Sequence, residues 1–450
     1  MQEDLRSLAS DIVERTRKLG ADECDVYVRS GVESSIEVRK GATEKLFEAG
    51  SHSLSIRVIK DKRTAVCNTS DLTPRALDDL VRSAVELATI SEPDEFAGLP
   101  EREDLAFDVL NTLQLYDERI ESLSVDEMKD IVLRAEQAAF DFDARISNSN
   151  GAEFGAERGL LVLANSLGFC GSYPYTAASF AVQVMADDEG GKKRNDYWFS
   201  AERLFHRLES PEEVGRRAAA RAVRKLGARK VATRAVAVVW DPTMTMRLAG
   251  MIAGAASGEA LYKRATFLAD REGAEIASSL LSITSDPTVP ARLGSRPFDG
   301  EGVRTRPNAI IEGGVFRQFL FDSYNARRMG RRTTGNAVRS GDAMGIGGGN
   351  TIVAPGTMPQ DAIIEDVADG LYLTDLMGFG VNTTTGDLSL GAAGVWIERG
   401  QLAYPVSEIN ISGNLNQLLR DIDAVGDDLV WLPGGAAPMI RVREMMVSGL

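Results

Sequence analysis

The amino-acid sequence predicts an α+β protein with two domains. The N-terminal domain is an α/β domain with antiparallel strands and flanking helices, and the C-terminal domain is mostly antiparallel β. A chain of 450 residues is long enough for two to three domains of ordinary size. Apolar residues recur first at helical spacing and then at every second position before residue 226. Glycine-rich turn signals between short strand-like segments dominate the chain after residue 258.

The N-terminal domain is predicted over residues 1–226 and begins with an amphipathic helix that ends at Gly20. Its apolar positions are Leu5, Leu8, Ile12 and Leu19. Alternation of apolar and polar residues then predicts antiparallel strands with one face toward water. These strands contain residues 24–28, 36–38 and 54–58, with turns at Gly41 and at 61–63.

A second helix begins at Thr73 as its N-cap, with Pro74 in the first helical position. The apolar residues of this helix share one face, and they are Leu77, Leu80, Val81, Ala84 and Leu87. An acidic connection covers residues 91–123.

The rest of this domain repeats the order helix, strands, helix. Ser124 and Glu127 form the capping box of a third helix. Residues 148–151 predict a turn, and strand-like runs follow at 160–163 and 180–184. A fourth helix begins at residues 210–213 and extends to about Leu226. Because individual residues do not repeat, an internal duplication is only a hypothesis.

A basic segment, residues 227–234, separates the first domain from a C-terminal domain at 235–450. This domain opens with an apolar strand at 235–240. Asp241 and Pro242 then begin a helix that extends to about Ser257. Residues 250–258 of the helix region are nearly all small, which would let another backbone approach closely. One further short helix is predicted around residues 322–329, with turns at 312–314, 385–387 and 398–400.

Composition excludes several classes of protein. Lys and Arg number 51 against 66 Asp and Glu, and the net charge of −15 disfavours direct binding of nucleic acid. The start of the chain lacks the apolar run of a signal peptide, and no stretch approaches the ~20 apolar residues of a membrane span. Cys24, Cys67 and Cys170 are scattered, so we expect reduced, buried thiols in a soluble, cytoplasmic protein without membrane contact.

Common catalytic motifs are missing from the sequence. The two histidines, His52 and His206, lie far apart, and the chain has no H-E-x-x-H, G-x-S-x-G or P-loop pattern. The glycine-rich stretch 345–350 suits either an anion-binding nest or a flexible surface loop. It does not open a helix after a strand, so it is no dinucleotide fingerprint.

One segment is a candidate for substrate binding. It consists of Gly378, Phe379, Gly380, Val381 and Asn382, between an apolar strand and a turn. Glycines beside an extended segment let another backbone come near, as when a peptide adds to a sheet as a strand. A bulged hairpin without a ligand explains the same pattern equally well.

Three blocks of the C-terminal half resemble the TldD/PmbA family. Residues 295–305, SRPFDGEGVRT, are similar to its SxPFDxEGVxT signature. The second block comprises residues 375–381 and 385–394, and the third comprises 404–409 and 413–415. The similarity extends over essentially the whole chain, and the closer match is the PmbA (TldE) branch, historically called modulator of DNA gyrase.

The resemblance implies a cytoplasmic zinc metallopeptidase built from two related subunits. The TldD-type subunit carries an HExxxH helix that binds zinc, and the PmbA-type subunit lacks that motif. The complex degrades unfolded peptides, including an antitoxin, and matures a peptide antibiotic. Counting back from residues 262–267, the motif falls on Gly250, Met251 and Ala255 in this chain. These side chains cannot replace the two imidazoles and the general-base carboxylate.

We therefore expect a subunit without catalytic residues, metal or cofactor of its own, which shapes the substrate cleft and supports a zinc-bearing TldD-type partner. Unfolded peptides are the expected substrates, and a homodimer is possible when the partner is absent. A non-enzymatic homodimer that binds peptides or another ligand is the alternative. A third interpretation is an independent hydrolase that uses carboxylates such as Asp375 and Asp387.

Overall fold

Long antiparallel strands dominate the structure, a computed structural model that describes residues 2–108, 112–340 and 343–449. Helices and strands of the N-terminal part follow each other in the order α1 (Gln2–Lys18), β1 (Glu23–Arg39), β2 (Ala42–Lys60), β3 (Arg63–Thr69), α2 (Pro74–Ile90), α3 (Glu118–Glu121), α4 (Val125–Phe140), β4 (Ile146–Asn165), β5 (Cys170–Asp187), β6 (Lys193–Glu202) and α5 (Pro211–Val223). The predicted α+β class is confirmed.

The N-terminal sheet has the strand order β3-β2-β1-β4-β5-β6, and all its neighbours are antiparallel. The sheet therefore consists of two similar units. Each unit has one helix, three strands and a second helix, and the two units meet where β1 pairs with β4. There Asp25 lies opposite Asn165, and Val38 lies opposite Ala152. This arrangement repeats the elements in the way that the hypothesis of an internal duplication requires.

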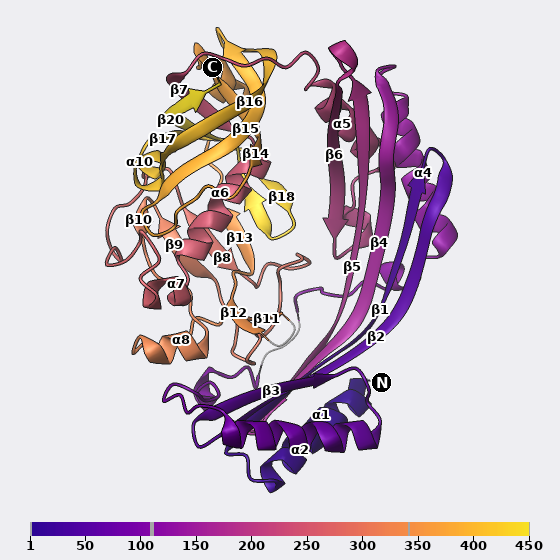
Figure 1. Ribbon diagram of the computed structural model, residues 1–450, viewed down its shortest axis with the longest axis vertical. Coiled ribbons are helices and arrows are strands. Elements are labelled where there is room, and N and C mark those ends of the chain that lie inside the picture. The colour runs from indigo at the N-terminus through magenta and orange to yellow at the C-terminus, as the bar shows by residue number, and fades with distance from the viewer. Residues whose placement is uncertain (1, 109–111, 341–342, 450) are drawn as a thin grey trace.

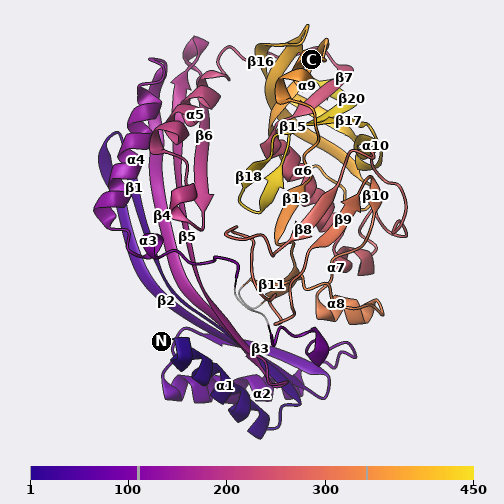
Figure 2. The ribbon, with the colours of Figure 1, turned by 180° about the vertical axis from the view of Figure 1, so that it is seen from behind.

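Helices cover one face of this curved sheet, and the concave face turns toward the C-terminal part (Figures 1 and 2). The helices α1 and α2 pack on the end of β1 that holds Val26 and Val28, whereas α4 and α5 pack on the end with Ile36 and Val38. Even-numbered side chains of a strand share a face, so both helix pairs cover the same side.

Helix starts follow the predictions, but some details differ. Both hydrogen bonds of the capping box at Ser124 and Glu127 are present. Leu19 and Leu87, predicted to be on apolar faces, are 47% and 44% exposed. Of the three thiols, only Cys24 is buried, while Cys67 and Cys170 are half-buried.

Residues 148–151 form no turn between strands, contrary to the prediction. They lie inside β4, where the pairing register with β5 shifts between Ser149 and Gly151. Gly151 has a φ of +119°, which an L side chain rarely adopts. Turn-forming residues thus serve here as a bulge in a strand of 20 residues.

The C-terminal part contains two larger sheets. Its elements are β7 (Arg234–Trp240), α6 (Pro242–Ala255), α7 (Gly258–Tyr262), β8 (Ile283–Asp286), β9 (Asn308–Glu312), β10 (Val315–Phe316), α8 (Ser323–Arg328), β11 (Ala337–Ser340), β12 (Ala343–Ile346), β13 (Asn350–Val353), α9 (Gln360–Glu365), β14 (Asp369–Met377), β15 (Asp387–Glu398), β16 (Gln401–Asn414), α10 (Leu415–Arg420), β17 (Ile422–Val425), β18 (Val430–Leu432), β19 (Gly435–Ala437) and β20 (Ile440–Ser448).

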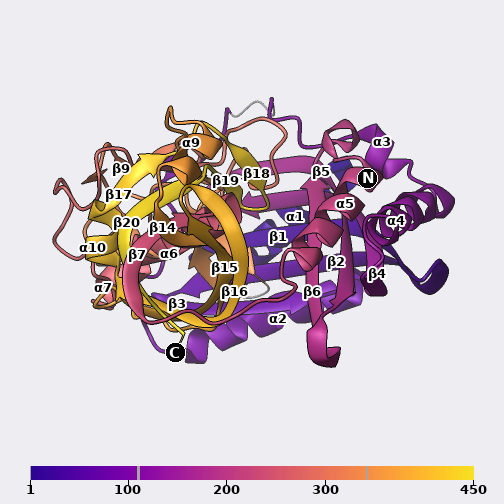
Figure 3. The same cartoon turned by 90° about the horizontal axis from the view of Figure 1, so that it is seen from above.

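One of these sheets, β16-β15-β14-β7-β20-β17, curls so far that β16 also pairs with β20, and Figure 3 shows the resulting ring. The other sheet has the order β10-β9-β8-β13-β19-β18. Most pairings are antiparallel, as predicted, but β7–β14 and β13–β19 are parallel. Helix α6 contacts both sheets, and its buried side chains belong to the core that the sheets share.

A neighbouring backbone approaches the small-residue stretch 250–258 as predicted, but only at its end, where the amide of Gly258 donates to the carbonyl oxygen of Leu320 at 2.7 Å. A Cβ atom added at Gly250 or Gly254 would meet nothing within 4 Å. The close approach is at Gly258, the first residue of α7, where a Cβ atom would lie 2.2 Å from the ring of Phe321. The small residues therefore leave one face of α6 uncovered at Gly250 and Gly254, and among these glycines only Gly258 is packed closely against a neighbour.

The signature block at 295–305 joins the two parts of the molecule. Phe298 packs edge-on against Phe169 and Tyr173 of the N-terminal part, with ring centroids 5.3 Å apart in both pairs. Glu301 forms an ion pair with Arg57 of β2. The block is thus a structural joint. None of the helices in the described part of the chain could cross a membrane.

Candidate functional site

The three positions aligned with the zinc motif lie on α6 but do not share one surface. Gly250 is exposed, Met251 is half-buried and Ala255 is 1% exposed. Positions 250 and 255 are five residues apart, so they point about 140° away from each other around the helix. Glycine and alanine carry no donor atom for a metal.

A zinc ion does not fit these residues of α6. Zinc sites use thiolate, imidazole and carboxylate ligands, and Met251 offers only a thioether. Among residues 2–108, 112–340 and 343–449, no three His, Cys, Asp or Glu side chains gather as a metal site would require.

Arg247 of α6 holds the start of the predicted substrate segment, residues 378–382. Its Nη2 atom donates a hydrogen bond to the carbonyl oxygen of Gly378 at 3.0 Å, and its Nη1 atom donates to the carbonyl oxygen of Leu376. The structure thus brings the degenerate zinc helix and this segment together. Sequence reasoning missed Arg247, because its acceptors are backbone atoms that are distant along the chain.

The segment 378–382 forms one side of a tight hairpin with the start of β15. The amide of Ser389 donates to the carbonyl oxygen of Gly380 at 2.7 Å, and the amide of Asn382 donates to the carbonyl oxygen of Asp387 at 2.8 Å. One backbone edge is therefore already paired within the chain. A Cβ atom at Gly380 would lie 1.9 Å from the Ser389 carbonyl oxygen, so glycine is required there.

Two side chains near this hairpin turn to solvent. Phe379 is fully exposed and Met377 is 51% exposed. Large apolar side chains exposed close together mark surfaces that bind a partner or a ligand. Binding of a peptide at residues 378–382 stays a prediction.

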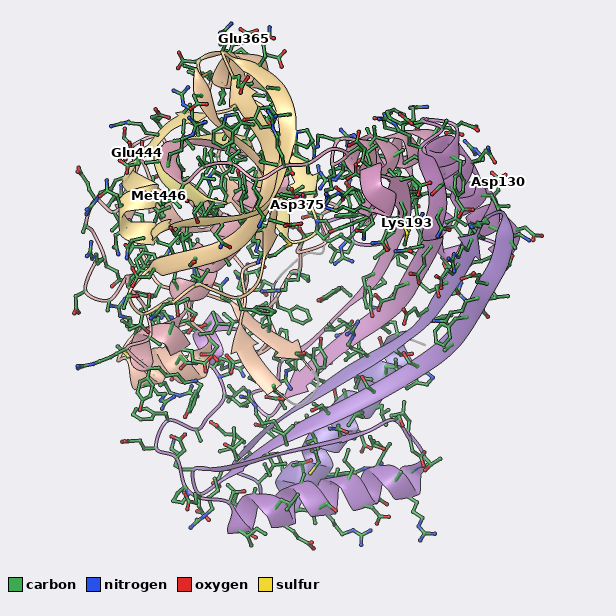
Figure 4. All side chains as sticks on the ribbon, turned by 45° about the horizontal axis from the view of Figure 1, so that its top comes forward. Asp130, Lys193, Glu365, Asp375, Glu444 and Met446 are labelled. Carbon is green, nitrogen blue, oxygen red and sulfur yellow. The ribbon has the colours of Figure 1, made fainter. Side chains whose placement is uncertain are left out.

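The two carboxylates of the third interpretation do not form a pair. Asp375 lies opposite Ala393 on β15, whereas Asp387 begins that strand six residues earlier, about 20 Å away along it. Asp375 faces the N-terminal part, where Lys225 lies 3.3 Å from it (Figure 4). Asp387 accepts hydrogen bonds from Thr385 and Asn414. A site with paired carboxylates at these residues is therefore contradicted.

The glycine-rich stretch 345–350 packs against the body of the molecule. The carbonyl oxygen of Gly347 accepts a hydrogen bond from Asn336 at 3.1 Å, and a Cβ atom at Gly349 would lie 2.5 Å from Pro287. These glycines allow the stretch to pack closely against its neighbours, and both interpretations of it stay predictions.

A cavity of about 520 Å³ opens between β6 and the first turns of α6. It is lined mainly by aromatic and apolar side chains, with Arg247 and Asp375 among them. The aromatic and apolar residues are Tyr197, Trp198, Phe199, Met244, Met246, Leu376, Leu432 and Pro433.

A smaller cavity of about 290 Å³ adjoins it and shares Trp198, Arg221 and Thr243. Three arginines of the α5 region, Arg217, Arg221 and Arg224, line this cavity together with one carboxylate, that of Asp241. We call it the arginine cavity. The i, i+4, i+7 spacing of these arginines is visible in the sequence and could have identified a basic helix face.

Asp241, the N-cap of α6, lies inside the arginine cavity, and both of its oxygens accept hydrogen bonds. One of its oxygens accepts hydrogen bonds from the amide and the hydroxyl of Thr243, at 2.9 and 2.6 Å. The other accepts from the hydroxyl of Tyr372 at 2.8 Å. Burial and the adjacent Asp241 carboxylate raise the pKa of Tyr372, so this hydroxyl stays protonated.

A third cavity, of about 440 Å³, lies at the joint between β2–β3 and α8 and is lined by five carboxylates and two arginines. Burial, together with the nearby charge of Glu301, raises the pKa of Asp322 there to about 6. Burial and the same neighbour raise the pKa of Asp299, which supports the loop beside it, to about 7. These groups belong to the joint between the two parts.

Three family models of the PmbA/TldA metallopeptidases match the chain: domain 1 at residues 24–88, the central domain at 118–226 and the C-terminal domain at 233–449. The metalloprotease PmbA homologue of Haemophilus influenzae is 35% identical over 100% of this chain and 97% of its own length. Metalloprotease PmbA of Escherichia coli O157:H7 is 35% identical over 95% of this chain and 93% of its own length.

Solved structures match the whole fold. A protein described as a modulator of DNA gyrase from Bacteroides thetaiotaomicron superposes with a TM-score of 0.92, at 28% identity and 99% coverage of both chains. TldE from Thermococcus kodakarensis superposes with a TM-score of 0.89 over 98% of this chain and 100% of its own, at 23% identity, which indicates the shared fold.

Proposed function

The chain belongs to the PmbA/TldA metallopeptidase family, and we propose that it is the zinc-free subunit of a two-subunit peptidase that cleaves unfolded peptides in the cytoplasm. Its partner is a TldD-type subunit, which supplies the zinc ion. The observation that carries this proposal is the set of side chains at the motif positions of α6. Gly250, Met251 and Ala255 cannot hold a zinc ion or accept a proton from a water molecule.

A zinc ion held by the partner would supply the Lewis acidity that makes a water molecule nucleophilic, and no residue of this chain would take part in that activation. This chain contributes the walls of the substrate cleft. Arg247 fixes the backbone at residues 376–378, so that the exposed side chain of Phe379 projects from a supported hairpin. The neighbouring cavity of about 520 Å³ between β6 and α6, which we call the aromatic cavity, has an apolar lining that could accept the apolar side chains of an unfolded peptide.

The proposal is tested with the purified chain, with a purified TldD-type subunit and with their mixture. Zinc content is measured by elemental analysis, and cleavage is followed with an unstructured peptide that carries a fluorophore and a quencher. We expect no stoichiometric zinc and no cleavage by the chain alone, and zinc with cleavage in the mixture. A partner whose zinc-binding histidines are replaced is the control, and its mixture should be inactive.

Two results would change the assignment. Stoichiometric zinc and cleavage by this chain alone would refute the proposal. If the mixture neither binds zinc nor cleaves, the chain is better explained as a homodimeric protein that binds peptides or another ligand without hydrolysis.

A further inference from the structure

The arginine cavity is basic although the chain as a whole is strongly acidic. The net charge is −15, yet three guanidinium groups line this cavity with a single carboxylate. The cavity lies between the two parts of the molecule, because α5 and β6 form one wall and the start of α6, α9, β14 and β18 form the other. A basic cavity in such a chain indicates a ligand that carries negative charge.

Most charges around this cavity already have partners. Arg217 pairs with Glu209 at 3.1 Å, and Arg221 pairs with Asp196 at 3.3 Å. Both guanidinium groups also lie over the ring of Trp198, at 4.9 and 5.4 Å from its centroid.

Arg217 and Arg221 each have a carboxylate partner, whereas Arg224 has none in the described part of the chain. Its Nη2 atom is buried and finds no hydrogen-bond acceptor among the described residues. No ion pair of Arg224 forms within the described ranges, and its guanidinium group lies over the face of Tyr372, 6.0 Å from the ring centroid. Asp241, the one carboxylate that lines the cavity, accepts from Thr243 and Tyr372 and makes no hydrogen bond with Arg224 in the described part of the chain.

A buried donor without an acceptor is unfavourable and uncommon in folded proteins. An acceptor that arrives with a ligand removes this cost. The planar guanidinium group presents its N–H groups as a fork that matches the two oxygens of a carboxylate. The arginine cavity is therefore suited to a carboxylate group.

The adjoining aromatic cavity shows what this carboxylate would be attached to. It shares Trp198, Arg221 and Thr243 with the arginine cavity and continues to Met246 and Arg247. Its rings and methionine side chains form apolar surface that adapts to different side chains. A charged group at one end and an apolar extension at the other describe the C-terminal end of a peptide.

We propose that the arginine cavity binds the C-terminal carboxylate of a peptide through Arg224, with Arg221 in support, while the preceding apolar side chains occupy the cavity between β6 and α6. The site extends the proposed function, because it selects the free end of an unfolded peptide. It belongs to this chain alone, so it is tested without the zinc-bearing partner.

The experiment measures binding of two fluorescent peptides to the purified full-length chain by anisotropy. Both have the same apolar sequence, and one ends in a free carboxylate whereas the other ends in an amide. We expect the free acid to bind at least roughly tenfold more tightly, because a hydrogen bond between two charged groups is lost in the amide. Inorganic phosphate and acetate are added as competitors.

Variants assign the effect to Arg224. In Arg224→Gln the preference for the free acid should disappear, and in Arg224→Lys part of it should remain. Arg216→Gln is the matched control on the same helix, since Arg216 is exposed and pairs with Glu213. This variant should keep the full preference. Circular dichroism and thermal unfolding confirm that each variant is folded.

Three outcomes would overturn the inference: equal binding of acid and amide, no binding of either peptide, or an equal loss in Arg216→Gln. Binding of phosphate that depends on Arg224, without a preference between the peptides, would assign the cavity to an inorganic anion and overturn it as well. None of these results bears on zinc content or cleavage by the two-subunit complex, so the proposed function is judged separately.

Discussion

The guanidinium group of Arg57, on β2, lies 3.4 Å from the carboxylate of Glu301 in the C-terminal part. Arg57 also forms an ion pair with Asp25 of β1, which in turn lies 2.6 Å from Arg339 of β11. All four side chains are at most 9% exposed. Two carboxylates and two guanidinium groups thus alternate in a buried network across the joint.

Removal of one charge from this network should destabilise the protein. In Arg57→Gln, Asp25 loses one of its two partners and Glu301 loses its ion pair, and both stay buried. We expect the free energy of unfolding to fall by about 3–5 kcal/mol. Urea unfolding followed by tryptophan fluorescence measures it. Arg15→Gln is the control, because Arg15 pairs with Asp11 and Asp78 at the surface and should contribute less than about 1 kcal/mol. Similar effects of the two substitutions would contradict this view of the joint.

Asp322 should make stability depend on pH. Its pKa is raised to about 6, above the usual value near 3.8, by burial and by the charge of Glu301. At a pH between about 4 and 6, Asp322 is therefore protonated in the folded state and ionised in the unfolded state. This contribution to stability is therefore complete below about pH 4 and is lost as the pH rises through about 6.

Asp322→Asn keeps an N-cap side chain for α8 but removes the titrating charge. We expect the variant to be more stable than the natural chain at pH 8, by up to about 3 kcal/mol, and equally stable near pH 4. Urea unfolding at a series of pH values gives both curves. A difference that does not change with pH would show that the buried charge is not its cause.

Two glycines near the end of α6 should respond to alanine in opposite ways. Gly250→Ala adds a methyl group where nothing lies within 4 Å, so it should stabilise the helix by up to about 1 kcal/mol. Gly258→Ala places the methyl group against the ring of Phe321 and should cost about 1–3 kcal/mol. Thermal unfolding of the two variants compares them. Destabilisation by Gly250→Ala would mean that this face of α6 is covered in the folded protein.

Phe379 tests the predicted substrate segment better than Gly380 does, because any side chain at Gly380 clashes with the backbone of Ser389. Phe379→Ala should leave the melting temperature unchanged, since the ring is fully exposed. Cleavage of an unfolded peptide by the proposed two-subunit complex should fall at least about fivefold if the ring contacts the peptide or the partner. Leu46→Ala, a 56% exposed position on β2, is the control that should retain full activity. Unchanged cleavage in Phe379→Ala would remove residues 378–382 from the candidate site.

Local signals in the sequence predicted the helix starts well. Thr73–Pro74, the Ser124 capping box and Asp241–Pro242 all begin helices where expected, because the signal lies within a few residues. The extent of β4 was not predictable in this way. Its turn-forming residues 148–151 are held in a strand by pairing with β5, and the pairing with β1 begins directly after them at Ala152.

The candidate site was predicted only in part for the same reason. The segment 378–382 and the substituted motif on α6 can be found in the sequence, and the structure brings them together. Arg247 gives no local signal of its role, and the spacing of Arg224 from Arg217 and Arg221 indicates a basic helix face but not the cavity that it lines. The acceptors of Arg247 belong to another strand, and the position of Arg224 becomes apparent only when α5 faces the start of α6.

The charge network at the joint also constrains the order of events during synthesis. Asp25 and Arg57 are among the first residues to leave the ribosome, but Arg339 is made 314 residues after Asp25. A nascent N-terminal sheet would have to bury the carboxylate of Asp25 with only one of its two cations available. We therefore expect the growing chain to keep this corner of the sheet hydrated and open until residues 301 and 339 emerge, so that the first half of the protein completes its folding only after about half of the second half has been made.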